Sequence, residues 1–433
     1  MAYQNNIMYK ITKLPNQLEL ISAPIAGTKA ATVLFMAATG SRFEKRADNG
    51  LSHFLEHLFF KGTRKRPNTL AISSELDKAG GEYNAFTGKE YTGFYVKVEA
   101  GQLKLALDVL ADMLLNSRFA AKEIEREKGV VIEELNMYLD NPLYYIEDLF
   151  EQCLYGDTPA GRDTVGSKKT IAGFSRGQVL NYYASQYSAK QAVICLAGKV
   201  GEAAVKAAAG YFKKFGEKKY RDKTPTNDRQ AGPKINLHFK KTDQAHLSLG
   251  VRATAYGHDD ELAVKILSLI LGGSMSSRLF IGLRERSGLA YYVRTHNEAY
   301  TDSGYLTTQA GVPVSKLNEA VKIILAEYGK LAAAPVGETE LKKAKQCLIG
   351  RLAIELETSD NLASWYARQA ILLKEQASGE KVLAPEKYFV RVKRVSAADL
   401  IRVAKKIFVA DKLNLAVIGP YQDEEKYVKL LKV

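Results

Sequence analysis

The chain has 433 residues, of which 46% are hydrophobic and 25% are charged, and its formal net charge is +14. This composition is that of a globular protein, and the length exceeds one typical domain. No apolar run approaches the length of a membrane span, so we expect no membrane partner. The lysines are spread thinly and no nucleic-acid motif accompanies them. We therefore expect no nucleic-acid partner, and take the charge to favour solubility or acidic peptides.

The cysteines and the N-terminus bear on the compartment. Cys153, Cys195 and Cys347 are far apart and odd in number, which predicts neither a disulfide framework nor a zinc knuckle. Residues 1–11 show no charged segment followed by an apolar one, so we expect no secretory signal. Both observations favour the reducing cytoplasm.

The first strong pattern is a strand at residues 30–39 followed by a helix with the pentapeptide His53-Phe-Leu-Glu56-His57. Histidines at i and i+4 lie on one face of a helix, one turn apart, so both imidazoles can reach one ion. Glu56 projects from the same side, where a carboxylate could take a proton from water on the ion. The pattern is His-Glu-x-x-His written backwards, the inverted zincin motif. Taken alone, it could also be a polar helix face.

A third ligand is needed, because catalytic zinc usually takes three protein ligands and keeps one position for water. The next acid-rich helix, residues 121–135, offers several carboxylates. Glu127 and Glu134 are seven residues apart and share a helix face beside apolar side chains. The residues alone leave Glu127, Glu133 and Glu134 open as the third ligand.

The remaining elements suggest two similar halves. In the first half, strands at 80–87 and 91–98 precede a helix at 101–116, and in the second half the strands and helices are expected at 246–253, 261–271, 304–310 and 314–332. Strands bounded by long amphipathic helices predict an α+β fold of two homologous α/β-sandwich halves, each a mostly antiparallel sheet packed by helices. The charged segment between them contains proline and glycine and is typical of a solvated linker. The predicted division is 1–212, 213–234 and 235–433.

The run Gly50–Thr63, which contains the pentapeptide, resembles the signature of the pitrilysin (M16) family of zinc metallopeptidases. In that family a glutamate ligand follows the inverted motif after a gap of about 76 residues, and 76 residues separate His57 from Glu134 here. The resemblance therefore implies Glu134 as the third ligand. It also implies that Glu127, which matches a second family glutamate, supports activity without binding the metal.

Two further segments extend the resemblance, which covers the chain from about residue 10 to the C-terminus. Gly80–Thr87 is similar to the family's edge strand, where Asn84, Ala85 and Phe86 would bind a substrate peptide as an added strand. Leu283–Tyr291 is similar to the segment whose arginine and tyrosine grip the substrate backbone and stabilise the tetrahedral intermediate. The matching residues are Arg284 and Tyr291.

The resemblance implies a zinc-dependent endopeptidase that cleaves unfolded peptides or small polypeptides in a clamshell chamber, with one Zn²⁺ per chain and Glu56 as general base. Cobalt or manganese could replace zinc, because ligand type does not settle metal identity. Because the chain carries both the zinc motif and the Arg284/Tyr291 pair, a homodimer is expected, in which these two residues serve the zinc of the partner chain. The alternatives are a heterodimer with an inactive partner, and a non-catalytic assembly subunit.

Overall fold

The computed structural model describes residues 9–375 and 382–432; residues 1–8, for which the sequence predicts no secretory signal, lie outside this part. The chain forms two compact units, each built around one sheet. Unit 1 collects Met1–Leu135, Asp163–Thr224 and Ala353–Pro385, and unit 2 collects Asn136–Arg162, Pro225–Leu352 and Glu386–Val433.

The sheet of unit 1 has six strands in the order β1-β2-β6-β3-β5-β4. They are β1 (Lys10–Lys13), β2 (Glu19–Pro24), β6 (Ala192–Gly198), β3 (Ala30–Ala37), β5 (Thr92–Glu99) and β4 (Glu82–Thr87). Neighbours are antiparallel except β2 and β6, which are parallel. Strands β3 and β6 are buried almost throughout, as expected for apolar runs at the centre of a sheet covered on both faces.

The sheet of unit 2 has five strands in the order β7-β11-β8-β10-β9. They are β7 (Lys234–Phe239), β11 (Leu413–Gly419), β8 (Gln244–Arg252), β10 (Gly304–Pro313) and β9 (Tyr292–Ala299). Only β7 and β11 are parallel among these neighbours. The predicted fold class, with two mostly antiparallel sheets packed by helices, is confirmed, and the predicted elements form with ends that differ by at most five residues.

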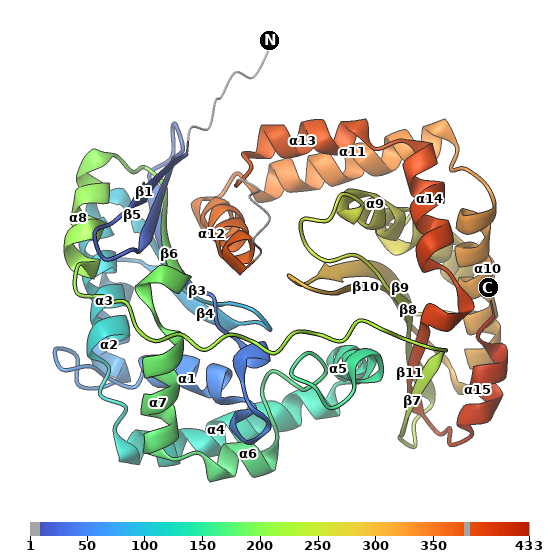
Figure 1. The fold of residues 1–433 in the computed structure, drawn as a ribbon, viewed down its shortest axis with the longest axis horizontal. Helices are drawn as coiled ribbons and strands as arrows, with labels where there is room; N and C mark the ends of the chain where they lie inside the picture. Colours follow the sequence, from blue (N-terminus) through green and yellow to red (C-terminus); the bar gives the residue numbers. More distant parts are fainter. Residues whose placement is uncertain (1–8, 376–381, 433) are drawn as a thin grey trace. The chain divides into compact units, whose positions relative to one another are not determined.

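Helices cover both faces of each sheet. The helices that lie mainly in unit 1 are α1 (Leu51–Phe59), α2 (Thr69–Lys78), α3 (Leu103–Asn116), α4 (Ala121–Asp140), α6 (Lys168–Gly173), α7 (Arg176–Gln186), α8 (Glu202–Phe212) and α12 (Ser359–Glu375). Helices α3 and α8 pack on one face of the sheet and α12 on the other (Figure 1). The apolar side chains of α3, among them Leu107, Leu110 and Leu114, point into this core.

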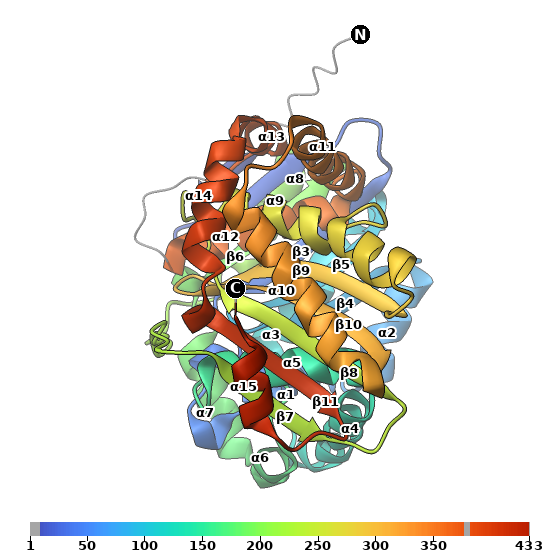
Figure 2. The same cartoon turned by 90° about the vertical axis from the view of Figure 1, so that its right-hand side faces the viewer.

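Unit 2 repeats this arrangement. Its helices are α5 (Pro142–Tyr155), α9 (Glu261–Gly272), α10 (Leu317–Ala333), most of α11 (Glu338–Glu355), α13 (Pro385–Arg394), α14 (Ala397–Ile407) and α15 (Glu424–Leu430). Figure 2 shows α10 and α15 in front of the strands they cover, and α5 packs on β8 and β11. None of the described helices is both long and apolar enough to cross a bilayer.

The two units are not the contiguous halves 1–212 and 235–433 drawn from the sequence. Helix α5 comes from the N-terminal part of the chain yet packs on the sheet of unit 2. Helix α12 comes from the C-terminal part yet packs on β3 and β6 of unit 1. Each sheet needs helices on both faces. The apolar pattern of a helix shows that it packs on a sheet, but it does not show on which of the two sheets it packs.

The prediction that residues 213–234 form a solvated linker is only partly correct. The segment forms no helix or strand between α8 and β7, but Phe215 is 1% exposed and lies edge-on against Phe35. The Lys218 ammonium lies 3.7 Å from the ring centroid of Tyr183, and burial lowers the pKa of this lysine to about 8. The buried Phe215 ring and the Lys218 side chain over Tyr183 hold part of the basic run against unit 1.

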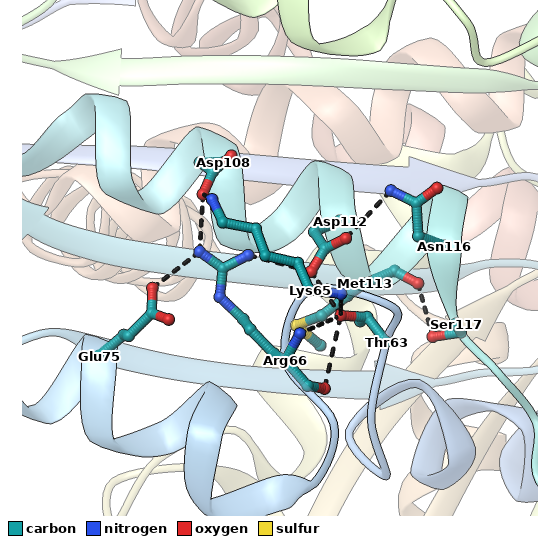
Figure 3. A network of polar contacts seen from close by, with 9 residues as sticks. All are labelled: Thr63, Lys65, Arg66, Glu75, Asp108, Asp112, Met113, Asn116 and Ser117. Carbon is teal, nitrogen blue, oxygen red and sulfur yellow. Dashed lines mark hydrogen bonds and ion pairs between the residues drawn. The ribbon is translucent and has the colours of Figure 1, made fainter.

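The loop between α1 and α2 is tied down by a buried arginine (Figure 3). The Arg66 side chain is 1% exposed, and its guanidinium lies 2.7 Å from Glu75, 2.6 Å from Asp108 and 3.0 Å from Asp112. Glu75 belongs to α2, and the two aspartates belong to α3. Arg66 therefore joins the chain that leaves α1 to the two helices that follow.

Candidate metal centre

Helix α1 begins at a position that requires glycine. Gly50 has φ +94°, and a Cβ there would lie 2.3 Å from the carbonyl oxygen of Val165. The buried Glu44 carboxylate accepts hydrogen bonds from the backbone N–H groups of Gly50 at 2.7 Å and Ser52 at 2.6 Å. A carboxylate at a helix N-terminus satisfies free donors and complements the helix dipole. The start of α1 is thus fixed by two features outside the pentapeptide.

Three expected residues converge one turn into this helix. His53 Nε2 lies 3.6 Å from one oxygen of Glu134, and His57 Nε2 lies 3.3 Å from the other. One ligand atom from each residue lies within 4.8 Å of the others. Glu133, the neighbouring alternative, is exposed. The structure therefore selects Glu134 as the carboxylate that faces both imidazoles.

Glu127 contacts His57 from the other side of the ring, at Nδ1, and not from the side where Glu134 faces both imidazoles. Glu127 is 1% exposed, and its carboxylate lies 2.9 Å from Nδ1 of His57. The Lys61 ammonium pairs with the second oxygen of Glu127 at 2.7 Å. Because a carboxylate on Nδ1 fixes the orientation of a histidine, the nitrogen of His57 that could bind a metal is Nε2, which faces Glu134.

The charges at the site stabilise one another. Hydrogen bonds from His53 and His57 hold the pKa of Glu134 far below its usual range. Burial opposes a charged His57, but hydrogen bonds with Glu127 and Glu134 outweigh it and raise the imidazole pKa to about 9. For Glu127, burial raises the pKa, but His57 and Lys61 outweigh it and lower the value overall. The carboxylates of Glu127 and Glu134 thus remain ionised near neutral pH.

Glu56 lies on the same helix between the two histidines and has its own partner. The Thr87 hydroxyl, at the end of strand β4, donates a hydrogen bond of 2.5 Å to Oε2 of Glu56. Burial raises the pKa of Glu56, while Thr87 and the two histidines oppose the rise. A carboxyl group with a raised pKa, beside a candidate metal site, has the properties of a general base.

The donor set fits zinc. Two imidazole nitrogens and one carboxylate oxygen match the His₂Glu ligands of catalytic zinc sites, in which a fourth position stays open. Within residues 9–375 and 382–432, this is the one group of three or more such side chains with the spacing of a metal site. His53, His57 and Glu134 would hold the ion.

Strand β4 forms an edge of the sheet of unit 1. It pairs with β5 along one side, from Glu82 to Thr87, and ends the strand order of the sheet. Asn84 is exposed, while Ala85 and Phe86 are half-buried. The Phe86 ring covers Gly93 on β5, where a Cβ would lie 2.2 Å from a ring atom. An edge strand can accept a peptide as a further strand.

Arg284 and Tyr291 lie together in unit 2. Arg284 belongs to a π-helical segment (Phe280–Arg286), and its guanidinium donates a 2.8 Å hydrogen bond to the carbonyl oxygen of Tyr291. It also lies 5.1 Å from the ring centroid of Phe280. Tyr291 directly precedes β9 and is 76% exposed. π-Helical turns are frequent at functional sites.

Comparison with known proteins identifies the chain. Residues 20–168 match the family model of insulinase (peptidase family M16), and residues 173–348 match that of the peptidase M16 inactive domain. An uncharacterized zinc protease of Streptomyces coelicolor is 34% identical over 421 residues, which cover 96% of this chain and 90% of that protein. The chain belongs to peptidase family M16. The predicted resemblance is thereby confirmed.

A further relative and a solved structure are also similar to this M16 chain over most of its length. An uncharacterized zinc protease of Bacillus subtilis is 35% identical over 383 residues, covering 88% of this chain and 91% of that protein. A protease structure from Helicobacter pylori has a TM-score of 0.89 at 23% identity and covers 95% of this chain and 99% of that one, which shows a shared fold. Membership of a zinc-dependent family, with relatives named zinc proteases, supports a peptidase role in general terms.

Three residues of the M16 site were not singled out from the sequence: Glu44, Lys61 and Thr87. Lys61 lies within the signature run Gly50–Thr63, and Thr87 ends the predicted edge strand, so both were quoted without a role. Glu44 carries no local signal that links it to α1. Lys61 and Thr87 meet partners far along the chain, Glu127 and Glu56, and such pairs are set by tertiary structure.

Proposed function

We propose that the chain is a zinc-dependent endopeptidase that cleaves unfolded peptides or small polypeptides through activated water. The observation that carries the proposal is the convergence of His53, His57 and Glu134 within 4.8 Å, with Glu56 on the same helix as the two histidines. Zinc bound there would supply Lewis acidity, polarising the peptide carbonyl and lowering the pKa of water.

The residues of unit 1 divide the remaining work. Glu56 takes a proton from the attacking water and later delivers it to the leaving amine. Glu127 holds the ring of His57 through Nδ1, and Lys61 holds Glu127. Strand β4 binds the peptide backbone along Asn84, Ala85 and Phe86, so selection would rest on an extended, unfolded substrate more than on its side chains.

The pair in unit 2 would act on the oxyanion. A guanidinium and a phenol stabilise charge that develops on a carbonyl oxygen. The hydrogen bond from the Arg284 guanidinium to the Tyr291 carbonyl oxygen holds the two residues close together. We propose that two chains pair around a closed chamber, with Arg284 and Tyr291 of one chain serving the metal site of the other. A heterodimer with an inactive partner is the alternative assembly.

The test is cleavage of a quenched, unstructured peptide of about twenty to thirty residues, a length suited to added-strand binding. Activity should disappear with a chelator and return with zinc, and metal analysis should give one zinc per chain. Light scattering should give a dimer. Zinc binding without cleavage of any such peptide would contradict the proposal and point instead to a non-catalytic assembly subunit or a missing partner.

A further inference from the structure

The candidate general base is held by a residue outside its own helix. Glu56 lies on α1, whereas Thr87 is the last residue of the edge strand β4. Their 2.5 Å hydrogen bond joins the helix with the two histidine ligands to the strand that would bind substrate. Both side chains are half-buried, so solvent competes only partly for this contact.

We propose that Thr87 is a positioning residue for Glu56, and that it couples the docking of a peptide on β4 to the orientation of the base. The inference rests on the proposed peptidase function and adds a residue to it. Thr87 would touch neither the substrate nor the metal.

The hydrogen bond suits a proton acceptor because it engages only one oxygen. The Thr87 hydroxyl donates to Oε2 of Glu56, which restricts rotation of the carboxylate and leaves Oε1 to receive the proton from water. After the transfer Oε2 is still an acceptor, so the hydroxyl does not have to turn. When Oε1 passes the proton to the leaving amine nitrogen, Glu56 returns to its first state with the same hydrogen bond.

The surrounding backbone keeps the strand end in place. The turn after Thr87 closes through the N–H of Gly88 and the carbonyl oxygen of Tyr91 at 2.8 Å. The N–H of Ser41 reaches the Gly88 carbonyl oxygen at 3.3 Å, and the N–H of Arg42 reaches that of Lys89 at 3.0 Å.

The same short segment also holds the helix. Arg42 and Glu90 form an ion pair at 2.5 Å with side chains that are 0% and 1% exposed. Two residues after Arg42, Glu44 accepts the first N–H groups of α1. One segment, residues 41–44, therefore fixes both the strand end that carries Thr87 and the helix that carries Glu56.

A docked peptide would act on this geometry from the open edge of β4. Pairing along residues 84–86, where the N–H of Ala85 donates to Oδ1 of Asn84 at 2.9 Å, would order the strand up to the residue before Thr87. Better order at Thr87 means better alignment of Glu56. Peptides long enough to pair with β4 should therefore gain in kcat over short ones, besides binding more tightly.

The experiment compares Thr87→Val, Thr87→Ser and Thr12→Val in the full-length zinc-loaded enzyme. Valine keeps the shape and the strand preference of threonine but removes the hydroxyl, and serine keeps the hydroxyl. Thr12 is half-buried on β1, the opposite edge strand of the same sheet, and serves as the matched control. For each variant, kcat and KM are measured with a long and a short quenched peptide, together with zinc content.

Thr87→Val should lower kcat for the long peptide by about 10- to 100-fold, the range for losing a hydrogen bond to a charged group. KM and zinc content should stay near the wild-type values, and the kcat advantage of the long peptide should shrink. Thr87→Ser should recover kcat to within about threefold, and Thr12→Val should match the wild type.

Thr87→Val with wild-type kcat would overturn the inference, as would equal losses in the serine and valine variants or a loss explained by missing zinc. A full length advantage in Thr87→Val would overturn the coupling. Failure of the proposed function is distinguishable, because zinc-loaded wild type would then cleave neither peptide.

Discussion

The two units share a scaffold but carry different side chains at corresponding places. The order β2-β6-β3-β5-β4 of unit 1 corresponds to β7-β11-β8-β10-β9 of unit 2, and each series begins with its one parallel pair. The helix after β3 carries His53, Glu56 and His57, whereas α9, the helix after β8, is largely apolar and has no histidine. One architecture can therefore carry the candidate metal ligands in one unit and the candidate pair Arg284 and Tyr291 in the other.

The loops after these helices extend the comparison. In unit 1, Arg66 is bound by three carboxylates and is 1% exposed. In unit 2, Arg278 follows α9 and binds Glu340 through two hydrogen bonds of 2.9 and 2.7 Å, with a side chain that is 23% exposed. In both units an arginine after the helix binds carboxylates of later helices. The arginine is more deeply buried in unit 1, where the helix carries the two histidines.

The largest effect should come from Glu56→Gln. The amide keeps the shape of the side chain but cannot accept the proton, so kcat should fall by about 10²- to 10⁴-fold while zinc stays bound. Steady-state kinetics and metal analysis of the same sample check this. Glu133→Gln, an exposed change on α4, is the control and should leave both quantities unchanged. Retained turnover in the metal-loaded Glu56→Gln variant would remove Glu56 from the role of base.

Arg66→Met should be the next largest effect, on stability. Removing the guanidinium leaves Asp112, which is 6% exposed, buried without its ion-pair partner, at a cost of about 3–5 kcal/mol in the free energy of unfolding. Arg278→Met should cost about 1 kcal/mol, because its pair is partly solvated. Urea unfolding of both variants measures the difference. Equal losses would show that the two arginines are equivalent despite their burial.

Arg284→Lys tests the chemistry assigned to unit 2. Lysine keeps the charge but loses the planar fork that reaches the Tyr291 carbonyl, so kcat/KM for peptide cleavage should fall by about 10²-fold with zinc affinity unchanged. The neighbouring Arg286 is exposed, and Arg286→Lys should have little effect. If both variants cleave like the wild type, unit 2 does not contribute this arginine to the reaction.

The smallest effect should come from Lys61→Met. Without the Lys61 ammonium, Glu127 loses its 2.7 Å ion pair and orients His57 less firmly, so zinc affinity should fall by about 10- to 100-fold. Competition with a metal-chelating dye measures the affinity. Lys65→Met, at an exposed lysine in the same loop, is the control. An unchanged affinity in Lys61→Met would limit its role to the packing of Glu127.

The sequence by itself determined the fold class, the helix with the two histidines and the candidate base. These features are encoded locally: the period of the apolar residues defines each element, and a spacing of four places two side chains on one helix face. The spacing on the second helix narrowed the third ligand to Glu127, Glu133 and Glu134, and the family resemblance pointed to the last of them.

Only the tertiary structure decided which carboxylate faces which group. The rotation of α4 against α1 places Glu134 on both imidazoles, Glu127 on Nδ1 of His57, and Glu133 in solvent. The same holds for the contact of Thr87 with Glu56, since a strand and a helix residue 31 positions apart meet there. Such contacts depend on how elements pack against one another, and the periodicity of one segment contains no information about the side chains of another.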